Sequence, residues 1–131
     1  QEIKNGRLKN LCMNNKLFID GSHNPLGAIA LNNFIDKVDG NVHVILGMMN
    51  NKNHKDYASH FKNISSLTTV DIPNQPNAIK GVMLKKKLKN IPNVSYKNSV
   101  ENAIKSIVLN KNDIVLITGS LYLAGEVLNL N

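Results

Sequence analysis

The chain alternates short apolar runs with segments of helical periodicity, and this alternation limits the possible folds more than any other feature. Strands are predicted at residues 16–20, 41–49, 66–72, 93–97 and 113–120, and residues 6–15 are a candidate for the first strand. Helices are predicted at residues 24–38, 54–64, 77–90 and 98–110, and a last helix begins near Ser120. Repeated β–α units imply a parallel sheet with helices on both faces. We therefore predict one α/β domain, a three-layer α/β/α Rossmann-like fold with about six mostly parallel strands.

Local signals mark several of these elements. Asn24 followed by Pro25 predicts a helix start, with Asn24 as the cap and Pro25 at the first helical position. Asn98 and Glu101 have the spacing of a capping box at the start of the helix predicted at 98–110. In the helix predicted at 54–64, periodicity turns Tyr57 and its apolar neighbours toward the core.

Composition limits the class of protein. A chain of 131 residues, 42% hydrophobic and 19% charged, is typical of one globular domain. It starts with Gln rather than Met, which leaves open whether it is a fragment or one domain of a longer protein. The single cysteine, Cys12, excludes an intrachain disulfide and a cysteine metal cage, and it fits a reducing cytoplasm.

The net charge of +7 raises the question of nucleic-acid binding. Lysine and asparagine are spread over the whole chain, however, and no aromatic residues alternate with the basic ones as in single-strand binders. The densest basic cluster, residues 85–87, suits a solvated helix face. No apolar run approaches the roughly 20 residues of a membrane span. We expect neither a nucleic-acid nor a membrane partner.

Three polar turns follow predicted strands, and they are the candidate binding segments. They are residues 20–25, 47–52 and 118–120. In an open parallel sheet, ligands bind beyond the carboxyl ends of the strands, which is where these turns lie.

Each turn carries a side chain that suits an anionic or hydroxylated ligand, and each also has a purely structural interpretation. Asp20 can accept hydrogen bonds from sugar hydroxyls and His23 can stack on a base or contact a phosphate; alternatively, Asp20 and Asn24 only satisfy backbone N–H groups of the turn. Lys52 can hold a carboxylate or phosphate, or it is a surface lysine. Ser120 places a hydroxyl at a helix N-terminus, where it either helps to bind an anion or is a plain cap.

Several catalytic motifs are absent from the sequence. It contains neither G-x-x-x-x-G-K-[ST] nor G-x-G-x-x-G, and no G-x-S-x-G turn. Its four histidines form no i, i+4 pair, which argues against a zinc site. The chain alone therefore lacks the residues needed to hydrolyse ATP.

Four segments carry a family resemblance: "GRLK" (6–9), "DGSHNP" (20–25), "LGMMNNKN" (46–53) and "TGSLYLAGEV" (118–127). They resemble the C-terminal domain of folylpolyglutamate synthase/dihydrofolate synthase, in the Mur ligase superfamily. The typical forms there are G-R-L-E, D-G-A-H-N-P, G-M-x-x-D-K-D and G-S-L-Y-L-x-G-E-V. The order and spacing agree, and the resemblance covers essentially the whole chain.

The resemblance implies an enzyme that joins glutamate to a pteroate or folate carboxylate, using ATP and Mg²⁺, through an acyl phosphate. A preceding ATPase domain would hold the phosphate loop, the Mg²⁺ ligands and most of the folate site. Residues 1–131 would then be a single C-terminal domain, cytoplasmic, with no catalytic or metal-binding residue of its own and inactive alone. The family also suggests an antiparallel first strand at the sheet edge. The alternative is a non-catalytic nucleotide-binding or regulatory module of the same fold.

The resemblance also assigns roles to individual residues. Arg7 would face the ATP phosphates, and Asp20 and His23 would contact the nucleotide. Lys52 and Ser120 fall where Mur-type ligases hold the carboxylates of the incoming amino acid. We expect both on the same edge of the sheet as the nucleotide turn, which requires their strands to lie close together.

Other positions shape the turns or depart from the family pattern. Asn24 fits best as the cap that shapes its turn. Ser22 stands where the family has Ala, which keeps a small side chain there. Asn51 and Asn53 replace the two Asp residues that flank the lysine, so the loop beside Lys52 has lost both carboxylates.

Overall fold

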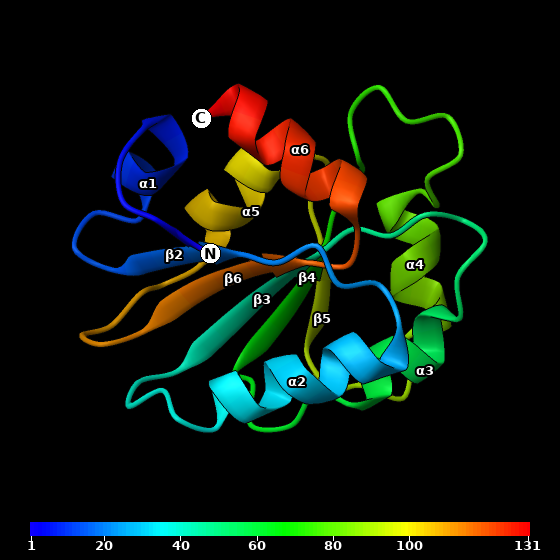
Figure 1. The fold of residues 1–131 in the computed structure, drawn as a ribbon, viewed down its shortest axis with the longest axis horizontal. Coiled ribbons are helices and arrows are strands. Elements are labelled where there is room, and N and C mark those ends of the chain that lie inside the picture. The colour runs from blue at the N-terminus through cyan, green and yellow to red at the C-terminus, as the bar shows by residue number, and fades with distance from the viewer.

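One six-stranded sheet runs through the centre of the molecule, in a computed structural model that describes all residues 1–131 (Figure 1). The strands are β1 (Glu2–Ile3), β2 (Lys16–Ile19), β3 (Val42–Leu46), β4 (Ser66–Thr69), β5 (Val94–Tyr96) and β6 (Ile114–Thr118). Their order across the sheet is β1-β2-β6-β3-β4-β5. β1 is antiparallel to β2, and every other neighbouring pair is parallel.

Helices cover both faces of this sheet. They are α1 (Arg7–Leu11), α2 (Pro25–Ile35), α3 (His54–Ser59), α4 (Gly81–Lys87), α5 (Val100–Ser106) and α6 (Leu121–Leu130). In Figure 1, α1, α5 and α6 lie above the sheet, α2 and α3 lie below it, and α4 stands at its right; α4 packs into the same core as α2 and α3. Each group packs its buried residues into a separate apolar core. The predicted three-layer α/β/α fold is confirmed.

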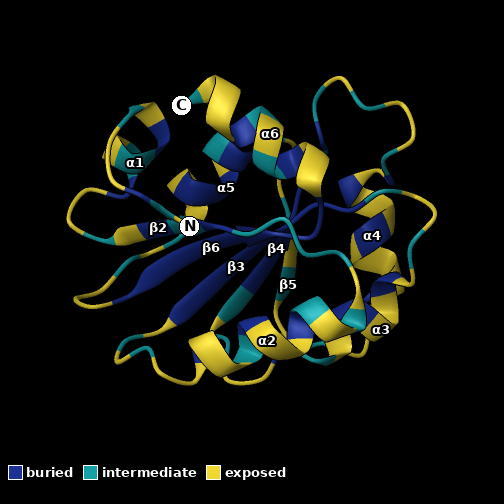
Figure 2. Cartoon of the chain, in the orientation of Figure 1, coloured by how far each residue is buried: buried dark blue, intermediate teal, exposed yellow.

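The central strands β3 and β6 are buried along their whole length (Figure 2). Their side chains alternate between the two cores, as a pleated strand requires. Val44 and Leu116 point into the core between the sheet and helices α2, α3 and α4. Ile45 and Ile117 point into the core between the sheet and helices α1, α5 and α6. A strand that is apolar on both faces is the signature of a parallel sheet covered on both sides.

The prediction of a first strand at residues 6–15 is wrong. Helix α1 occupies Arg7–Leu11, and the antiparallel edge strand is the two-residue β1 before it. Leu8 and Cys12 are both fully buried, and four residues apart they lie on one face of a helix. β1 is too short to show any periodicity in the sequence.

The predicted cap of helix α5 is also wrong, by one residue. Ser99 caps it, since its hydroxyl accepts a hydrogen bond from the Asn102 amide at 3.1 Å. Asn98 instead accepts from the side-chain amide of Asn102, and Glu101 pairs with Arg7 rather than folding back onto the cap. The helices predicted at 24–38, 54–64, 77–90 and 98–110 are all shorter in the structure, because their end residues lie in turns, bends or extended segments.

Candidate functional site

The three polar turns lie side by side because β2, β6 and β3 are consecutive in the sheet. Ile19 pairs with Ile117, and Leu46 pairs with Thr118, so the three strands end at nearly the same level. β6 is therefore adjacent to both other strands, and residues 20–25, 47–52 and 118–120 leave the sheet at one edge. Such a set of neighbouring carboxyl-end turns is where an open α/β sheet binds its ligand.

Asp20 is held by one of its two carboxylate oxygens. Oδ2 accepts a hydrogen bond from the Ser22 amide at 2.9 Å and faces the Thr118 hydroxyl at 3.4 Å. Oδ1 accepts no hydrogen bond from the protein, and the residue is half-buried. The carboxylate is thus oriented by the protein and keeps one oxygen for a ligand.

A hydroxyl cluster lies directly behind Asp20. The Tyr57 hydroxyl, brought in by helix α3, lies 2.8 Å from the Ser22 hydroxyl and 2.8 Å from the Thr118 hydroxyl. Tyr57 is fully buried. Burial raises the pKa of its phenol, although the two hydrogen bonds act in the opposite direction. Tyr57 is therefore a neutral, protonated hydrogen-bonding group.

Sequence reasoning missed this part of the site. It turns Tyr57 toward the core by periodicity and treats Ser22 only as a small side chain. One signal was available, because a buried tyrosine needs a hydrogen-bond partner for its hydroxyl. Nothing local indicates which partner that is, since Ser22 and Thr118 lie 35 and 61 residues away in the chain.

His23 and Asn24 complete the first turn. The Nδ1 atom of His23 lies 3.2 Å from the Gly21 carbonyl oxygen, so Nδ1 donates and Nε2 makes no hydrogen bond within the protein. Asn24 caps α2, with its side-chain oxygen accepting from the Gly27 amide at 3.0 Å, as the sequence predicts. A Cβ atom on Gly27 would stand 2.5 Å from the Ser22 Cβ, so only glycine permits this close approach.

Ser120 is a buried N-cap for helix α6. Its Oγ accepts hydrogen bonds from the amides of Tyr122 at 3.0 Å and Leu123 at 3.4 Å. An oxygen that accepts both of these bonds keeps its own proton available for donation. The cap interpretation is therefore correct, and it is compatible with a contact to a ligand.

Lys52 borders a cavity that reaches from the second turn to the start of α6. The cavity has a volume of about 490 Å³ and is lined by Met49, Asn50, Asn51, Lys52, Pro76, Asn77 and Tyr122. Tyr122 lies two residues after Ser120, so the Lys52 loop and the α6 N-terminus border the same space. The adjacency of β3 and β6 is what a ligand shared by Lys52 and Ser120 requires.

The loop around Lys52 is held by its own hydrogen bonds. The buried His54 ring lies with Nε2 2.8 Å from the Met49 carbonyl oxygen, and the Asn50 amide donates to the Asn77 carbonyl at 2.8 Å. Asn53 caps helix α3 by accepting from the Asp56 amide at 3.2 Å. Asparagine caps a helix as well as aspartate does, so this departure from the family pattern preserves the start of α3.

Arg7 does not join this group. Its exposed side chain forms an ion pair with Glu101, which joins helix α1 to helix α5. The Arg7 hydrogen bond and charge lower the pKa of Glu101. Arg7 borders a separate cavity of about 270 Å³, together with α6 residues such as Glu126. The structure brings together Asp20, His23, Lys52 and Ser120 around neighbouring turns, and Arg7 lies outside that set.

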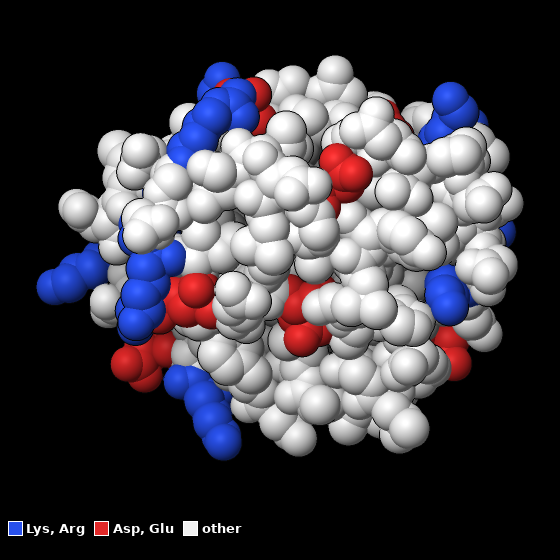
Figure 3. All heavy atoms as spheres, turned by 45° about the horizontal axis from the view of Figure 1, so that its top comes forward, with Lys and Arg blue, Asp and Glu red and all other residues white.

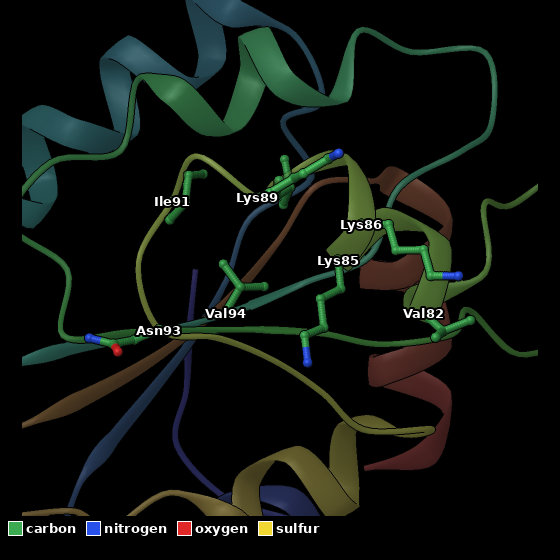
Figure 4. Close-up of a pocket in the computed structure, with 8 residues that line it drawn as sticks. Val82, Lys85, Lys86, Lys89, Ile91, Asn93 and Val94 are labelled. Atoms are coloured by element: carbon green, nitrogen blue, oxygen red, sulfur yellow. The ribbon is translucent and has the colours of Figure 1, made fainter.

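The largest cavity is elsewhere. It has a volume of about 640 Å³ and lies between the end of α4 and β5, lined by Val82, Lys85, Lys86, Leu88, Lys89, Ile91, Asn93 and Val94 (Figure 4). Val94 begins β5, so this groove is at the amino end of that strand, opposite to where parallel sheets bind ligands. Lysines at residues 85–87 in the last turn of α4 have a local cause, since cations stabilise a helix C-terminus.

A serine–histidine–aspartate group, with His43 and Asp113 buried and Ser66 half-buried, also lies at the amino end of the sheet. The His43 ring places Nδ1 2.8 Å from the Ser66 hydroxyl and Nε2 3.2 Å from Asp113 Oδ2. Burial disfavours the charged form of Asp113, but hydrogen bonds from the Asn110 and Asn41 amides and from His43 outweigh this and lower its pKa. Asp113 is occupied in joining two loops, so the group is structural.

Three findings concern other ligand classes. No group of three or more His, Cys, Asp or Glu side chains lies close enough to hold a metal ion. No helix is long and apolar enough to cross a membrane. On the face shown in Figure 3, the basic side chains are scattered and separated by uncharged and acidic atoms.

Residues 6–121 match the family described as "Mur ligase, glutamate ligase domain", and the chain belongs to that family. Its predicted relationship to the C-terminal domain of folylpolyglutamate synthases is confirmed at the level of family and fold. A comparison with curated proteins gives no match.

Solved structures with the same fold are folylpolyglutamate synthases. That of Thermotoga maritima has a TM-score of 0.77 and 24% identity, covering 89% of this chain and 28% of that one. The Mycobacterium tuberculosis enzyme complexed with ADP has a TM-score of 0.79 and 22% identity, covering 88% and 29%. The bifunctional folylpolyglutamate synthase/dihydrofolate synthase of Yersinia pestis, complexed with AMPPNP and Mn ion, has a TM-score of 0.76 and 21% identity, covering 87% of this chain and 28% of that one. The chain thus spans under a third of the length of these relatives.

Proposed function

We propose that this chain is the C-terminal domain of an ATP-dependent ligase that adds L-glutamate to dihydropteroate, to folates, or to both. The observation that carries the proposal is the convergence of three polar turns at the ends of β2, β6 and β3, in a chain of the glutamate ligase family. An N-terminal ATPase domain would supply the other half of the site. The cytoplasm is the proposed location.

Asp20 and His23 are the proposed nucleotide contacts in this domain. Asp20 Oδ1 and His23 Nε2 make no hydrogen bond within the protein, and both side chains are half-buried at the same turn. Arg7 is the proposed contact to the ATP phosphates. It is exposed, and it would have to leave Glu101 to reach them.

Lys52 and Ser120 are the proposed contacts to glutamate. An ammonium group on a flexible stem and a hydroxyl at a helix N-terminus suit two carboxylates that arrive together. The cavity bordered by Lys52 supports the assignment of Lys52, and buried Ser120 lies two residues before Tyr122, which lines the same cavity.

ATP and Mg²⁺ are the proposed cofactors of the complete enzyme, and when bound they would supply the phosphoryl group that activates the folate carboxylate. No group of carboxylates in this chain could hold Mg²⁺, and the proposal assigns the Mg²⁺ ligands to the ATPase domain. The residues of this chain bind and orient the adenosine and glutamate ends. Closure of the two domains would exclude water, which otherwise hydrolyses an acyl phosphate.

The proposal is tested by assaying the longer protein that contains this chain. ATP, Mg²⁺ and glutamate are supplied with dihydropteroate or with tetrahydrofolate, and mass spectrometry follows the gain of one glutamyl group per ADP formed. We expect products from at least one acceptor and none from residues 1–131 alone. ATP binding without any glutamyl product would favour the alternative, a regulatory nucleotide-binding module of the same fold.

A further inference from the structure

We propose that Tyr57 is a positioning residue, which orients the Asp20 carboxylate through a directed chain of hydroxyl groups. The proposal rests on the nucleotide-binding role proposed for Asp20. Tyr57 itself touches no ligand, because it is fully buried on helix α3.

The direction of the chain follows from the protons that are available. An ionised carboxylate only accepts, so the Thr118 hydroxyl donates to Asp20 Oδ2. Having used its single proton, Thr118 accepts from the Tyr57 hydroxyl at 2.8 Å. Tyr57 has then used its own proton and accepts from the Ser22 hydroxyl at 2.8 Å. The donors are therefore ordered Ser22, Tyr57, Thr118, and the series ends on Asp20; the Ser22 hydroxyl also lies 3.5 Å from the Thr118 hydroxyl, a longer contact than the bond of either hydroxyl to Tyr57.

The middle of this chain is rigid. The Tyr57 ring is fully buried and packs edge-on against Phe61, with 5.2 Å between the ring centres. The link from Thr118 to Asp20 is the longest, at 3.4 Å, and the Ser22 amide holds the same oxygen at 2.9 Å. Both donors act on Oδ2, so the arrangement turns Oδ1 toward a ligand.

Ser22 has a partner that explains its hydroxyl. A methyl group at this position could not donate to Tyr57. Tyr57 and Ser22 thus form a pair, in which the serine supplies the first proton of the chain. Hydrogen bonds that run in one direction polarise one another, so removing a middle member weakens the last link as well.

The first experiment is Tyr57→Phe in the complete enzyme, which keeps the ring and removes the hydroxyl. We expect the KM for ATP to rise roughly 2- to 10-fold, the change for one lost hydrogen bond, while the KM for glutamate stays constant. Tyr96→Phe is the matched control, because Tyr96 also donates to a carboxylate, that of Asp71, at 2.6 Å on edge strand β5. It should lower the Tm without changing the KM for ATP. Equal KM values for ATP in the two variants would overturn the proposal.

The order of the donors in the hydroxyl series gives a second, independent test. Ser22→Ala should raise the KM for ATP less than Tyr57→Phe, and the double variant should be no worse than Tyr57→Phe alone. Fully additive effects would contradict a directed chain. Thr118→Ser should retain the wild-type KM for ATP, whereas Thr118→Val should raise it. This pair of variants keeps the test valid if Tyr57→Phe folds poorly.

The two proposals fail in different ways. A wild-type enzyme that transfers no glutamate would refute the proposed function. A wild-type enzyme that is active, with a KM for ATP unaffected by Tyr57→Phe and by Thr118→Val, would refute only the role of Tyr57.

Discussion

Asp113 Oδ2 lies 3.2 Å from His43 Nε2 at the amino ends of β6 and β3, and it also accepts a hydrogen bond from the Asn110 amide at 3.0 Å. The other oxygen of Asp113, Oδ1, accepts a hydrogen bond from the Asn41 amide at 2.9 Å. These bonds hold the pKa of Asp113 below its usual value, although burial acts against them. One carboxylate thereby joins the loops that precede two central strands, so its ionisation contributes to stability.

This contribution should be lost in acid. Because the pKa of Asp113 is lower in the folded protein than in the unfolded chain, its stabilisation is complete above the unfolded value of about 3.9 and falls as the pH drops through the folded value. Asp113→Asn should lower the free energy of unfolding by about 1–3 kcal/mol at pH 7. It should also flatten the loss of Tm between neutral pH and pH 3. Asp39→Asn, at an exposed position, is the control; an equal pH dependence in wild type and Asp113→Asn would contradict this prediction.

In the complete enzyme, Asp20→Ala should impair the use of ATP more than the binding of folate. In the role proposed for Asp20, the substitution removes a charge-assisted hydrogen bond to the nucleotide, an effect of about 1.5–3 kcal/mol on kcat/KM for ATP. Initial-rate kinetics with ATP and folate varied separately measure it. Unchanged turnover and unchanged KM for ATP would mean that Asp20 only shapes the turn.

Lys52→Ala should raise the KM for glutamate much more than the KM for ATP, since its proposed partner is the incoming amino acid. Lys55→Ala is the matched control, because Lys55 is exposed on the neighbouring helix α3 and lies outside the cavity that Lys52 borders. Kinetics in which only the ATP parameters move would count against the assignment of Lys52.

Residues 1–131 alone should bind ATP weakly, because the chain contains no phosphate loop to cradle the triphosphate. Isothermal titration calorimetry with MgATP should give no saturable binding below the millimolar range. A micromolar affinity would place the main nucleotide site in this domain and would favour the binding-module alternative.

The sequence by itself determined the local elements and the turns that carry polar groups. The apolar runs of β3 and β6, the Asn24 cap and the Ser120 cap all follow from backbone geometry that acts within a few residues. Periodicity, cap chemistry and strand length are local properties, so they can be read from the sequence without knowledge of the fold. The error at residues 6–15 has a long-range cause, because burial of Leu8 and Cys12 in the core favours a helix there. The error at Asn98 is local, because the adjacent Ser99 makes the cap hydrogen bond.

Only the tertiary structure decided which turns meet. β6, the last strand in the chain, lies between β2 and β3, and this order brings Thr118 beside Asp20. It also lets Tyr57 contact Ser22 and Thr118, which no local pattern predicts. Strand order depends on how apolar faces far apart in the chain pack together, and each inserted strand creates contacts between residues that the sequence keeps apart. The site therefore consists of residues that the sequence supplies in separate turns and that long-range packing assembles.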